Sequence, residues 1–260
     1  MLRPRLRKDQ LIVFAVYCCM IAYATAVQAL PWWAYVLPLL AWSGVLAYGA
    51  MRIEARFFVP SVCSGNTGRK AIALTFDDGP LPQYTPVVLD ILAKAEAPAA
   101  FFCIGKNAEA NPGLLQRIYE AGHVVGNHSY AHHFWFDMFG STRMLTDMHQ
   151  ADDAVEAVID CRPRLFRPPY GVTNPNLARA ISRGGYVSVG WNIRSLDTVA
   201  KDADALQQRI LGQLKPGAIL LLHDTCAITA QLLPALITAI RARGYVIERL
   251  DKLINEAPYA

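Results

Sequence analysis

Short apolar runs alternate with helical patterns along most of this chain, and that alternation limits the possible folds more than any other feature. Apolar runs typical of buried strands occupy residues 71–76, 99–104, 123–127, 164–166, 186–191, 218–222 and 245–250. Helical patterns lie between them and begin at or near Thr85, Asn111, Thr142, Asn174 and Ala230. Strand–helix alternation repeated about seven times predicts an α/β fold with a parallel sheet, either an open doubly wound sheet or a barrel.

Three of these helices share a start signal, a polar residue followed by proline. The pairs are Thr85-Pro86, Asn111-Pro112 and Asn174-Pro175. Proline is favoured at the first helical position because the N–H that it lacks would have no partner there. No glycine-rich phosphate loop follows the first strand, so the sequence disfavours a nucleotide-binding sheet.

The first fifth of the chain is apolar and nearly free of charge. No charged residue occurs from Leu11 to Leu30 or from Pro31 to Met51, and each stretch has about the 20 residues that a helix needs to cross a bilayer. Trp32 and Trp33 lie between the two stretches, where aromatic rings favour the membrane–water interface. A single span followed by a buried or interfacial helix is one alternative, and a cleaved signal peptide fits less well because a second apolar stretch follows. We therefore expect a basic tail at 1–10, a transmembrane helical hairpin at 11–51 and a linker at 52–68.

Basic residues on both sides of the hairpin predict its orientation in the cell membrane. They are Arg3, Arg5, Arg7, Lys8, Arg52 and Arg56. By the positive-inside rule both ends face the cytoplasm, which would place the rest of the chain there, with an exterior or periplasmic placement as the alternative. These flanks explain most of the formal net charge of +4. No basic stripe with interleaved aromatic residues appears later, so we expect no nucleic-acid binding.

Polar residues that could carry chemistry follow the ends of several predicted strands. The groups are Asp77 with Asp78, His128 with His132, Arg167 with Tyr170, Asp197, and His223 with Asp224. The carboxyl ends of parallel strands meet at one edge of a sheet or barrel, where active sites assemble. The sequence therefore predicts one site at this edge.

Two histidines and an aspartate pair are candidates for metal binding. His128 and His132 are four residues apart in HSYAH, a spacing that lets both imidazoles face one point from a single helical turn. Two histidines and one carboxylate form a ligand set with open positions for water and substrate. Either Asp77 or Asp78 could supply the carboxylate, and the other could be a general base, since a divalent ion lowers the pKa of bound water to roughly 7. Without a metal, one histidine would cap a helix, the other would pack in the core, and the aspartates would belong to a simple turn.

Two further residues have a structural and a chemical interpretation each. His223 ends a very apolar run and is either a core histidine or a general acid for the leaving amine. Arg167 is either a surface cation or the partner that holds a buried carboxylate ionised. The aromatic segment 134–139 could form a sugar-binding rim, or a lid that packs on the barrel or on lipid.

Four strings resemble, in order and separation, the motifs of the NodB-homology polysaccharide deacetylases, carbohydrate esterase family 4. They are TFDDGP (75–80), HSYAH (128–132), RPPYG (167–171) and LLHD (221–224). The resemblance covers about Arg69 to Leu250 and places a deacetylase domain at 69–255. It implies a distorted (β/α)7 barrel and a metal-dependent hydrolase that removes an N-acetyl or other small N-acyl group from an amino sugar. It also implies one divalent ion, zinc or alternatively cobalt.

The resemblance assigns roles to the residues that match the motifs. Asp77 would be the catalytic base and His223 the general acid. The metal ligands would be Asp78, His128 and His132.

Further residues would support this group. Arg167 would orient Asp77, Asp197 would tune His223, and the backbone N–H of Tyr170 would help to hold the oxyanion. The residues expected at the substrate are Leu222, Pro169 and Thr198.

One motif departs from the family pattern, which is Asp-Ser-x-Asp-Trp. This chain has RSLDT at 194–198, so Arg194 replaces the first aspartate and Thr198 the tryptophan. The lost indole removes a wall of the acyl pocket. A smaller acyl group such as formyl therefore stays open beside acetyl.

The expected substrate depends on the side of the membrane. A cytoplasmic domain would meet a lipid-linked amino sugar, whereas an exterior one would meet peptidoglycan, chitin-like or other polysaccharides. The alternative function is a non-catalytic, membrane-tethered glycan-binding or scaffold protein. The presence of every acid, base and ligand position argues against that alternative.

Overall fold

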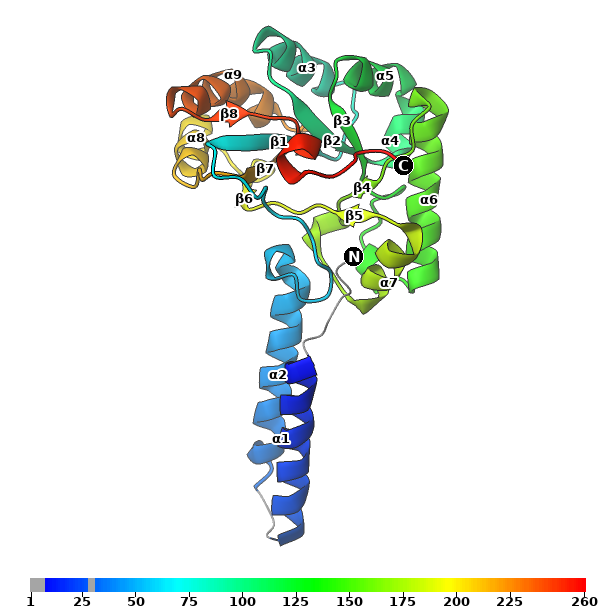
Figure 1. Cartoon of the computed structure of the whole chain (residues 1–260), viewed down its shortest axis with the longest axis vertical. Helices are drawn as coiled ribbons and strands as arrows, with labels where there is room; N and C mark the ends of the chain where they lie inside the picture. Colours follow the sequence, from blue (N-terminus) through cyan, green and yellow to red (C-terminus); the bar gives the residue numbers. More distant parts are fainter. Residues whose placement is uncertain (1–7, 28–30) are drawn as a thin grey trace.

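The structure, a computed structural model, describes residues 8–27 and 31–260. Two long helices lead into an α/β domain (Figure 1). The helices are α1 (Lys8–Val27), α2 (Trp33–Met51), α3 (Thr85–Lys94), α4 (Gly105–Ala110), α5 (Pro112–Glu120), α6 (Ser141–Ile159), α7 (Pro175–Gly184), α8 (Ala203–Leu211), α9 (Ala227–Ala242) and α10 (Leu250–Ile254). The strands are β1 (Ala71–Asp77), β2 (Ala99–Cys103), β3 (Val124–Asn127), β4 (Leu165–Phe166), β5 (Val187–Ser188), β6 (Ile193–Arg194), β7 (Ala218–His223) and β8 (Val246–Ile247).

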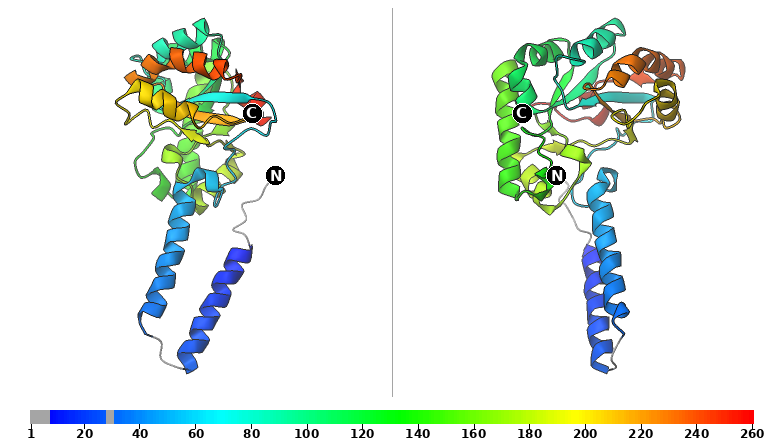
Figure 2. Two further views of the ribbon diagram at one scale, coloured as in Figure 1. Left: turned by 90° about the vertical axis from the view of Figure 1, so that its left-hand side faces the viewer. Right: turned by 180° about the vertical axis from the view of Figure 1, so that it is seen from behind.

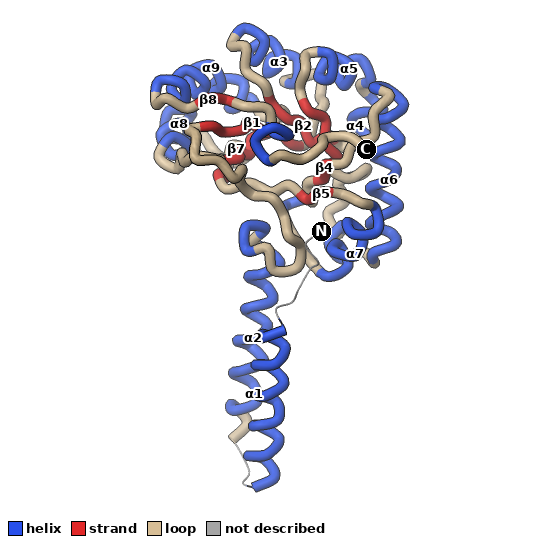
Figure 3. The backbone as a smooth tube through the Cα atoms, in the orientation of Figure 1, coloured by secondary structure: helices blue, strands red, loops and turns tan. Residues whose placement is uncertain are grey.

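The sheet has the strand order β5-β4-β3-β2-β1-β7-β6, and all of its strand pairs are parallel. β8 lies off this path and pairs with the first residues of β1. The seven strands of the path curl as a half-barrel with helices around it (Figure 3). The predicted α/β fold with a parallel sheet is confirmed, and the barrel is distorted and incomplete.

A segment before the first strand lies across the opening of the half-barrel. Val62 pairs with Val189 just after β5, and Ser64 pairs with Ala218 at the start of β7. The side chains of Val59 and Cys63 are buried. Most of the expected linker at 52–68 therefore packs on the domain.

The strands β1 and β7 at the centre of the sheet alternate between two hydrophobic layers. In β7, Leu220 and Leu222 pack in the layer shared with the outer helices. Ile219 and Leu221 pack in the layer on the other face of the sheet. This period-2 alternation decides which side chains of β7 can reach the same point as His223.

The expected helices are present, and at one of the three start signals the polar side chain caps the helix. Asn174 Oδ1 accepts a hydrogen bond from Leu177 N–H at 2.9 Å, at the start of α7. Three short helices, α4, α8 and α10, were not predicted. The strand expected at 186–191 ends at Ser188, and a separate strand, β6, follows.

The two N-terminal helices run side by side in opposite directions (Figure 2), and the rings of Phe14 and Trp42 stack between them at 4.8 Å. Within the described residues, α2 alone is long and apolar enough to cross a membrane, and the apolar part of α1, Phe14–Val27, is shorter. Of the two expected membrane spans, only the one at α2 is supported by length and apolarity. Arg3, Arg5 and Arg7, which carry the orientation argument, lie outside the described residues.

The last turn of α2 is bonded to the domain. Thr173 N–H donates to Ala50 O at 2.9 Å, and Thr173 Oγ1 donates to Gly49 O at 3.3 Å. Thr173 lies two residues after the RPPYG motif, which ends at Gly171. Helix α2 thus touches one of the predicted active-site loops.

Candidate active site

The three predicted metal ligands converge at the C-terminal edge of the sheet. Asp78 Oδ1 lies 3.4 Å from His128 Nε2 and 3.5 Å from His132 Nε2. One ligand atom from each residue lies within 4.8 Å of the others. Two ligands bound to zinc at about 2.1 Å in a tetrahedron are separated by roughly 3.4 Å, so these spacings suit one divalent ion.

The chemistry of the three donors also fits a cation. Asp78 Oδ1 is buried and has no hydrogen-bond partner among the described residues. Burial disfavours the charged carboxylate, but the neighbouring imidazoles outweigh it and lower the pKa of Asp78 to about 2. His128 Nδ1–H donates to Arg167 O at 2.8 Å, which turns the Nε2 lone pair toward the site. Metal is bound by an ionised carboxylate and by neutral imidazoles, so an ion at this site would take the place of any proton on Nε2 of His128.

HSYAH does not form the predicted helical turn. Residues 128–132 form a loop, in which Ser129 and His132 have positive φ angles of 65° and 45°. Ser129 Oγ accepts from His132 N–H at 3.0 Å, and Asn127 Oδ1 accepts from Ser129 N–H at 2.8 Å. Local side-chain bonds, which the four-residue spacing alone does not reveal, bring the two imidazoles together.

Asp77, the predicted base, forms a buried ion pair with Arg167. Arg167 Nη1 donates to Asp77 Oδ1 at 2.7 Å and to Thr75 Oγ1 at 2.8 Å. Asp77 Oδ2 lies 3.8 Å from His128 Nε2 and therefore beside the ligand group. The interpretation of Arg167 as a surface cation is wrong, because its side chain is fully buried.

The surroundings of Arg167 fix its orientation. Its Nε and Nη2 donate to Val189 O at 3.2 Å and Gly190 O at 3.0 Å, and its guanidinium lies 4.1 Å from the centre of the Phe102 ring. Burial lowers the pKa of Arg167 from its ordinary value, although the Asp77 carboxylate opposes that shift. The guanidinium thus presents a fixed donor to one oxygen of Asp77 and leaves the other oxygen facing the ligand group.

His223 and Asp197 form a second pair across the pocket. His223 Nδ1–H donates to Asp197 Oδ1 at 2.7 Å, and His223 N–H donates to Asp197 Oδ2 at 2.7 Å. Burial works to lower the pKa of His223, but the bond to Asp197 and the nearby carboxylates outweigh it and raise the pKa to about 9. His223 Nε2 lies 3.9 Å from Asp78 Oδ2. A protonated imidazole therefore faces the centre of the site at neutral pH.

The loop with Tyr170 lies next to the ligand group. Tyr170 has a φ of 59°, and its ring meets the His132 ring edge-on at 4.7 Å. No backbone hydrogen bond from Tyr170 N–H occurs among the described residues. Gly171 follows at a φ of 72°, where a Cβ would come within 2.4 Å of Trp191. The tight contact with Trp191 requires glycine and holds this loop in place.

The pocket at the site has a volume of about 190 Å³. Asp77 and all three predicted metal ligands line it together with His223 and Tyr170. The other lining residues are Pro168, Gly171, Trp191, Arg194, Leu196, Thr198 and Leu221. Thr198, one of the residues expected at the substrate, is among them.

Two of the expected substrate-binding residues were placed one position too far along the chain. Leu222 packs in the outer hydrophobic layer, whereas Leu221 shares the pocket face with His223 because alternate residues of a strand face the same side. Pro168, rather than Pro169, lines the pocket. The lost indole at 198 is partly replaced, since Trp191 supplies a ring to the pocket wall.

Several polar residues that support the site were not predicted. Thr229 Oγ1 and Ser195 Oγ both donate to Asp197, at 2.6 and 2.9 Å. Asn127 Nδ2 donates to Asp152 Oδ1 at 2.6 Å below the histidine loop. The sequence signal that could have revealed such residues is a polar side chain inside or next to an apolar run, as at Thr75 and Asn127.

A convergent Asp-His-His group beside an acid–base arrangement, at the C-terminal edge of a parallel half-barrel, defines a candidate metal-dependent hydrolase. The sequence profile of the polysaccharide deacetylases matches residues 64–189. The chain is 32% identical over 209 residues to the chitooligosaccharide deacetylase of Sinorhizobium fredii, covering 75% of this chain and 97% of that protein. The chain belongs to the polysaccharide deacetylase family, whose characteristic activity is the hydrolysis of a carbon–nitrogen bond.

Solved structures agree with this assignment. The Bc1960 peptidoglycan N-acetylglucosamine deacetylase superposes with a TM-score of 0.73 at 27% identity, covering 77% of this chain and 95% of that chain. BA3943 of Bacillus anthracis, a CE4 family pseudoenzyme, superposes with a TM-score of 0.71 at 25% identity, covering 76% of this chain and 71% of that chain. Because a pseudoenzyme shares the fold, catalysis depends on the site residues and not on the fold alone.

Proposed function

We propose that this chain is a membrane-tethered hydrolase that uses a divalent ion, zinc or alternatively cobalt, to remove a small N-acyl group from an amino sugar. The convergence of Asp78, His128 and His132 next to the Asp77–Arg167 pair is the observation that carries the proposal. An ion held by these three ligands would polarise the acyl carbonyl and lower the pKa of a water molecule.

The side chains around that position suit the remaining steps. Asp77, held by Arg167, would accept the proton of the attacking water. Tyr170 N–H, which lacks a backbone partner among the described residues, would donate to the oxyanion that forms on the acyl oxygen. His223, protonated and oriented by Asp197, would donate its proton to the nitrogen as the C–N bond breaks. The products would be a carboxylic acid and a free amino sugar.

The position of the site relative to α2 favours a substrate at the membrane surface. Thr173 is bonded to the last turn of α2, and Tyr170 is three residues away, so their Cα atoms are at most about 11 Å apart. A soluble polymer would need no such proximity. We infer that the substrate is a lipid-linked N-acylated amino sugar, with peptidoglycan or chitooligosaccharide chains, the substrates in the names of its relatives, as the alternatives.

Acyl release from a panel of sugars tests this function. Full-length protein in detergent, loaded with zinc or cobalt, would be incubated with N-acetylated and N-formylated sugars, both free and polyprenyl-linked. We expect release by the wild type with a preference for lipid-linked forms, and none above background by Asp77→Asn. Metal analysis should give one ion per chain, and Asp78→Asn should lose it.

The same panel distinguishes the proposed hydrolase from the alternative, a non-catalytic glycan-binding protein. A metal-loaded wild type that binds the glycans but releases no acyl group from any of them would establish a binding role. Equal release from free and lipid-linked sugars would support the hydrolase activity and contradict the proposal that the substrate is lipid-linked.

A further inference from the structure

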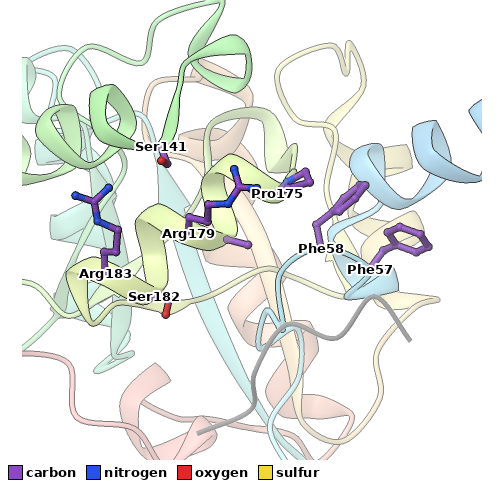
Figure 4. Close-up of a pocket in the computed structure, with 8 residues that line it drawn as sticks. Phe57, Phe58, Ser141, Pro175, Arg179, Ser182 and Arg183 are labelled. Atoms are coloured by element: carbon purple, nitrogen blue, oxygen red, sulfur yellow. The ribbon is translucent and has the colours of Figure 1, made fainter. Parts of the chain in front are cut away.

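A second cavity, of about 380 Å³, lies between α7 and the residues that follow α2 (Figure 4). It shares no lining residue with the active-site pocket. Two aromatic rings, two serines and two arginines form much of its wall, namely Phe57, Phe58, Ser141, Ser182, Arg179 and Arg183. The proposed hydrolase activity gives this cavity no role.

The cavity carries two positive charges that no carboxylate neutralises. Arg179 and Arg183 lie one turn apart on α7, and both are exposed. Arg179 Nη1 donates to Asn176 Oδ1 at 2.9 Å, and Arg183 Nη1 donates to Thr142 Oγ1 at 3.5 Å. Neither arginine is in any salt bridge within the part of the chain that the structure describes. Guanidinium groups bind phosphate oxygens with paired hydrogen bonds, so a phosphate group complements this charge.

The aromatic wall connects the cavity to α2. A Cβ on Gly49 would lie 2.5 Å from Cγ of Phe57, so the Phe57 ring packs directly on the last turns of α2. Between them lie Arg52, Glu54 and Arg56, all exposed, which leaves an excess of one positive charge in this segment. Aromatic rings and basic residues at the end of a span are typical of the lipid headgroup region. A free phosphate ion would use the arginines alone, whereas a lipid would use the rings as well.

We propose that this cavity binds an anionic phospholipid, with its phosphate between Arg179 and Arg183 and its glycerol and upper chains against Phe57 and Phe58. This inference rests on the proposed membrane attachment and is independent of the hydrolase activity. Since α7 begins two residues after Thr173, the bound lipid also holds the loop with Tyr170 close to the bilayer surface.

Lipid binding to the full-length protein tests the site. Protein in an uncharged detergent would be titrated with phosphatidylglycerol or phosphatidylcholine of the same chains, and bound lipid would be counted by native mass spectrometry. We expect the wild type to prefer phosphatidylglycerol by about tenfold, because each basic residue near an anionic lipid adds favourable energy. Arg179→Gln/Arg183→Gln should reduce that preference to within about twofold.

A matched variant controls for net charge. Arg241→Gln/Arg243→Gln removes the same charge at the end of α9, on the side of the domain away from α2 (Figure 1), and should keep the wild-type preference. An unchanged preference in the α7 variant, or an equal loss in the α9 variant, would overturn the proposal. Displacement of the lipid by excess inorganic phosphate would identify a soluble anion as the ligand instead. Acyl release measured in parallel shows separately whether the hydrolase proposal holds.

Discussion

The two charged pairs at the site differ in what remains when one partner is removed. Arg167 and Asp77 are both buried, so the loss of either leaves an uncompensated charge in the core, which typically costs 3–5 kcal/mol. His223 is less enclosed and lines the pocket, and its partner Asp197 keeps donors from Ser195 and Thr229. The His223–Asp197 pair can therefore be changed with less damage to the fold.

Replacement of His223 should reduce turnover without loss of metal. His223→Gln removes the proposed proton donor for the leaving nitrogen, and general acid catalysis is worth about 10²–10⁴ in rate. We expect kcat to fall by about that factor while KM changes little. Asp197→Asn should give a smaller fall in kcat, because the imidazole remains but loses its orienting carboxylate.

Steady-state kinetics and metal analysis of the same samples check this expectation. Both variants should hold one metal ion per chain, since neither residue belongs to the ligand group. A His223→Gln variant with wild-type kcat would remove His223 from the mechanism. Loss of the ion in either variant would instead assign that residue to metal binding.

A buried carboxylate below the histidine loop should make stability depend on pH. Burial raises the pKa of Asp152 from its ordinary value of 3.8 to about 6, although Tyr186 and Asn127 donate to it. Between these two pH values the folded protein binds more protons than the unfolded chain, so this group lowers stability as pH rises. Asp152→Asn should remove this effect, and its stability relative to wild type should rise by about 2–3 kcal/mol between pH 4 and 7.

Urea unfolding at several pH values measures that difference. Asp153→Asn is the matched control. Asp153, like Asp152, forms an ion pair with Arg162, but Asp153 is exposed. The control should follow the wild-type pH dependence. A constant difference between wild type and Asp152→Asn across the range would mean that Asp152 ionises normally in the folded state.

Residue type and position after strands predicted that Asp77, Asp78, His128, His132, Arg167, Asp197 and His223 lie at one edge of the sheet, and the structure brings them together there. The choice of Asp78 as the ligand, the two pairs and the position of Thr198 came from the family motifs. The errors at Leu222 and Pro169 are one-residue shifts in which a neighbour lines the pocket. Motif matching fixes the order of residues, but the face of a strand or the turn of a loop decides which neighbour reaches the pocket.

Elements with strong local signals were predicted, and those that depend on tertiary contacts were not. Helices α3, α5 and α7 begin next to a proline that the sequence marks. Strands β5 and β6 are two residues long each, and their extent is set by pairing with β4 and β7 rather than by their own pattern. The loop shape of residues 128–132 depends on Ser129 and Asn127, which spacing arguments ignore.

The loop of the RPPYG motif should be sensitive to one added methyl group. Gly171→Ala places a Cβ in a left-handed conformation and against the Trp191 ring, which would displace the loop and Tyr170 N–H. Misplacement of a group at the reacting centre by about 1 Å can cost 10²-fold, so we expect kcat to fall by about 10- to 100-fold.

Gly113→Ala is the control for a glycine substitution. Gly113 lies in α5, and nothing stands within 4 Å of the position of its Cβ. This variant should keep full activity and gain up to about 1 kcal/mol in stability. Wild-type kcat in Gly171→Ala would show that the loop tolerates the shift or that Tyr170 N–H is not needed.

In the whole molecule, the segment that leaves α2 is part of the domain. It crosses the opening of the half-barrel at Val62 and Ser64, and Val62 O accepts from Gly190 N–H at 2.9 Å. Gly190 O in turn accepts from Arg167. The end of α2, the closure of the half-barrel and the orientation of Asp77 are thus joined through consecutive contacts. A truncated domain that begins at Arg69 would lack this closure.

The side of the membrane can be tested with the chain itself. The basic residues before α1 and after α2 predict that both ends lie in the cytoplasm, so a C-terminal fluorescent-protein fusion in a bacterial host should fluoresce and an alkaline phosphatase fusion should stay inactive. Arg3, Arg5 and Arg7 changed together to Gln should weaken this preference, because basic residues near the first span set its orientation. The opposite pattern in the wild type, an active phosphatase and a dark fluorescent protein, would place the domain outside and favour wall polysaccharides over a cytoplasmic lipid-linked sugar. Cleavage after the first apolar stretch, seen as a smaller mature protein, would replace the hairpin by a signal peptide.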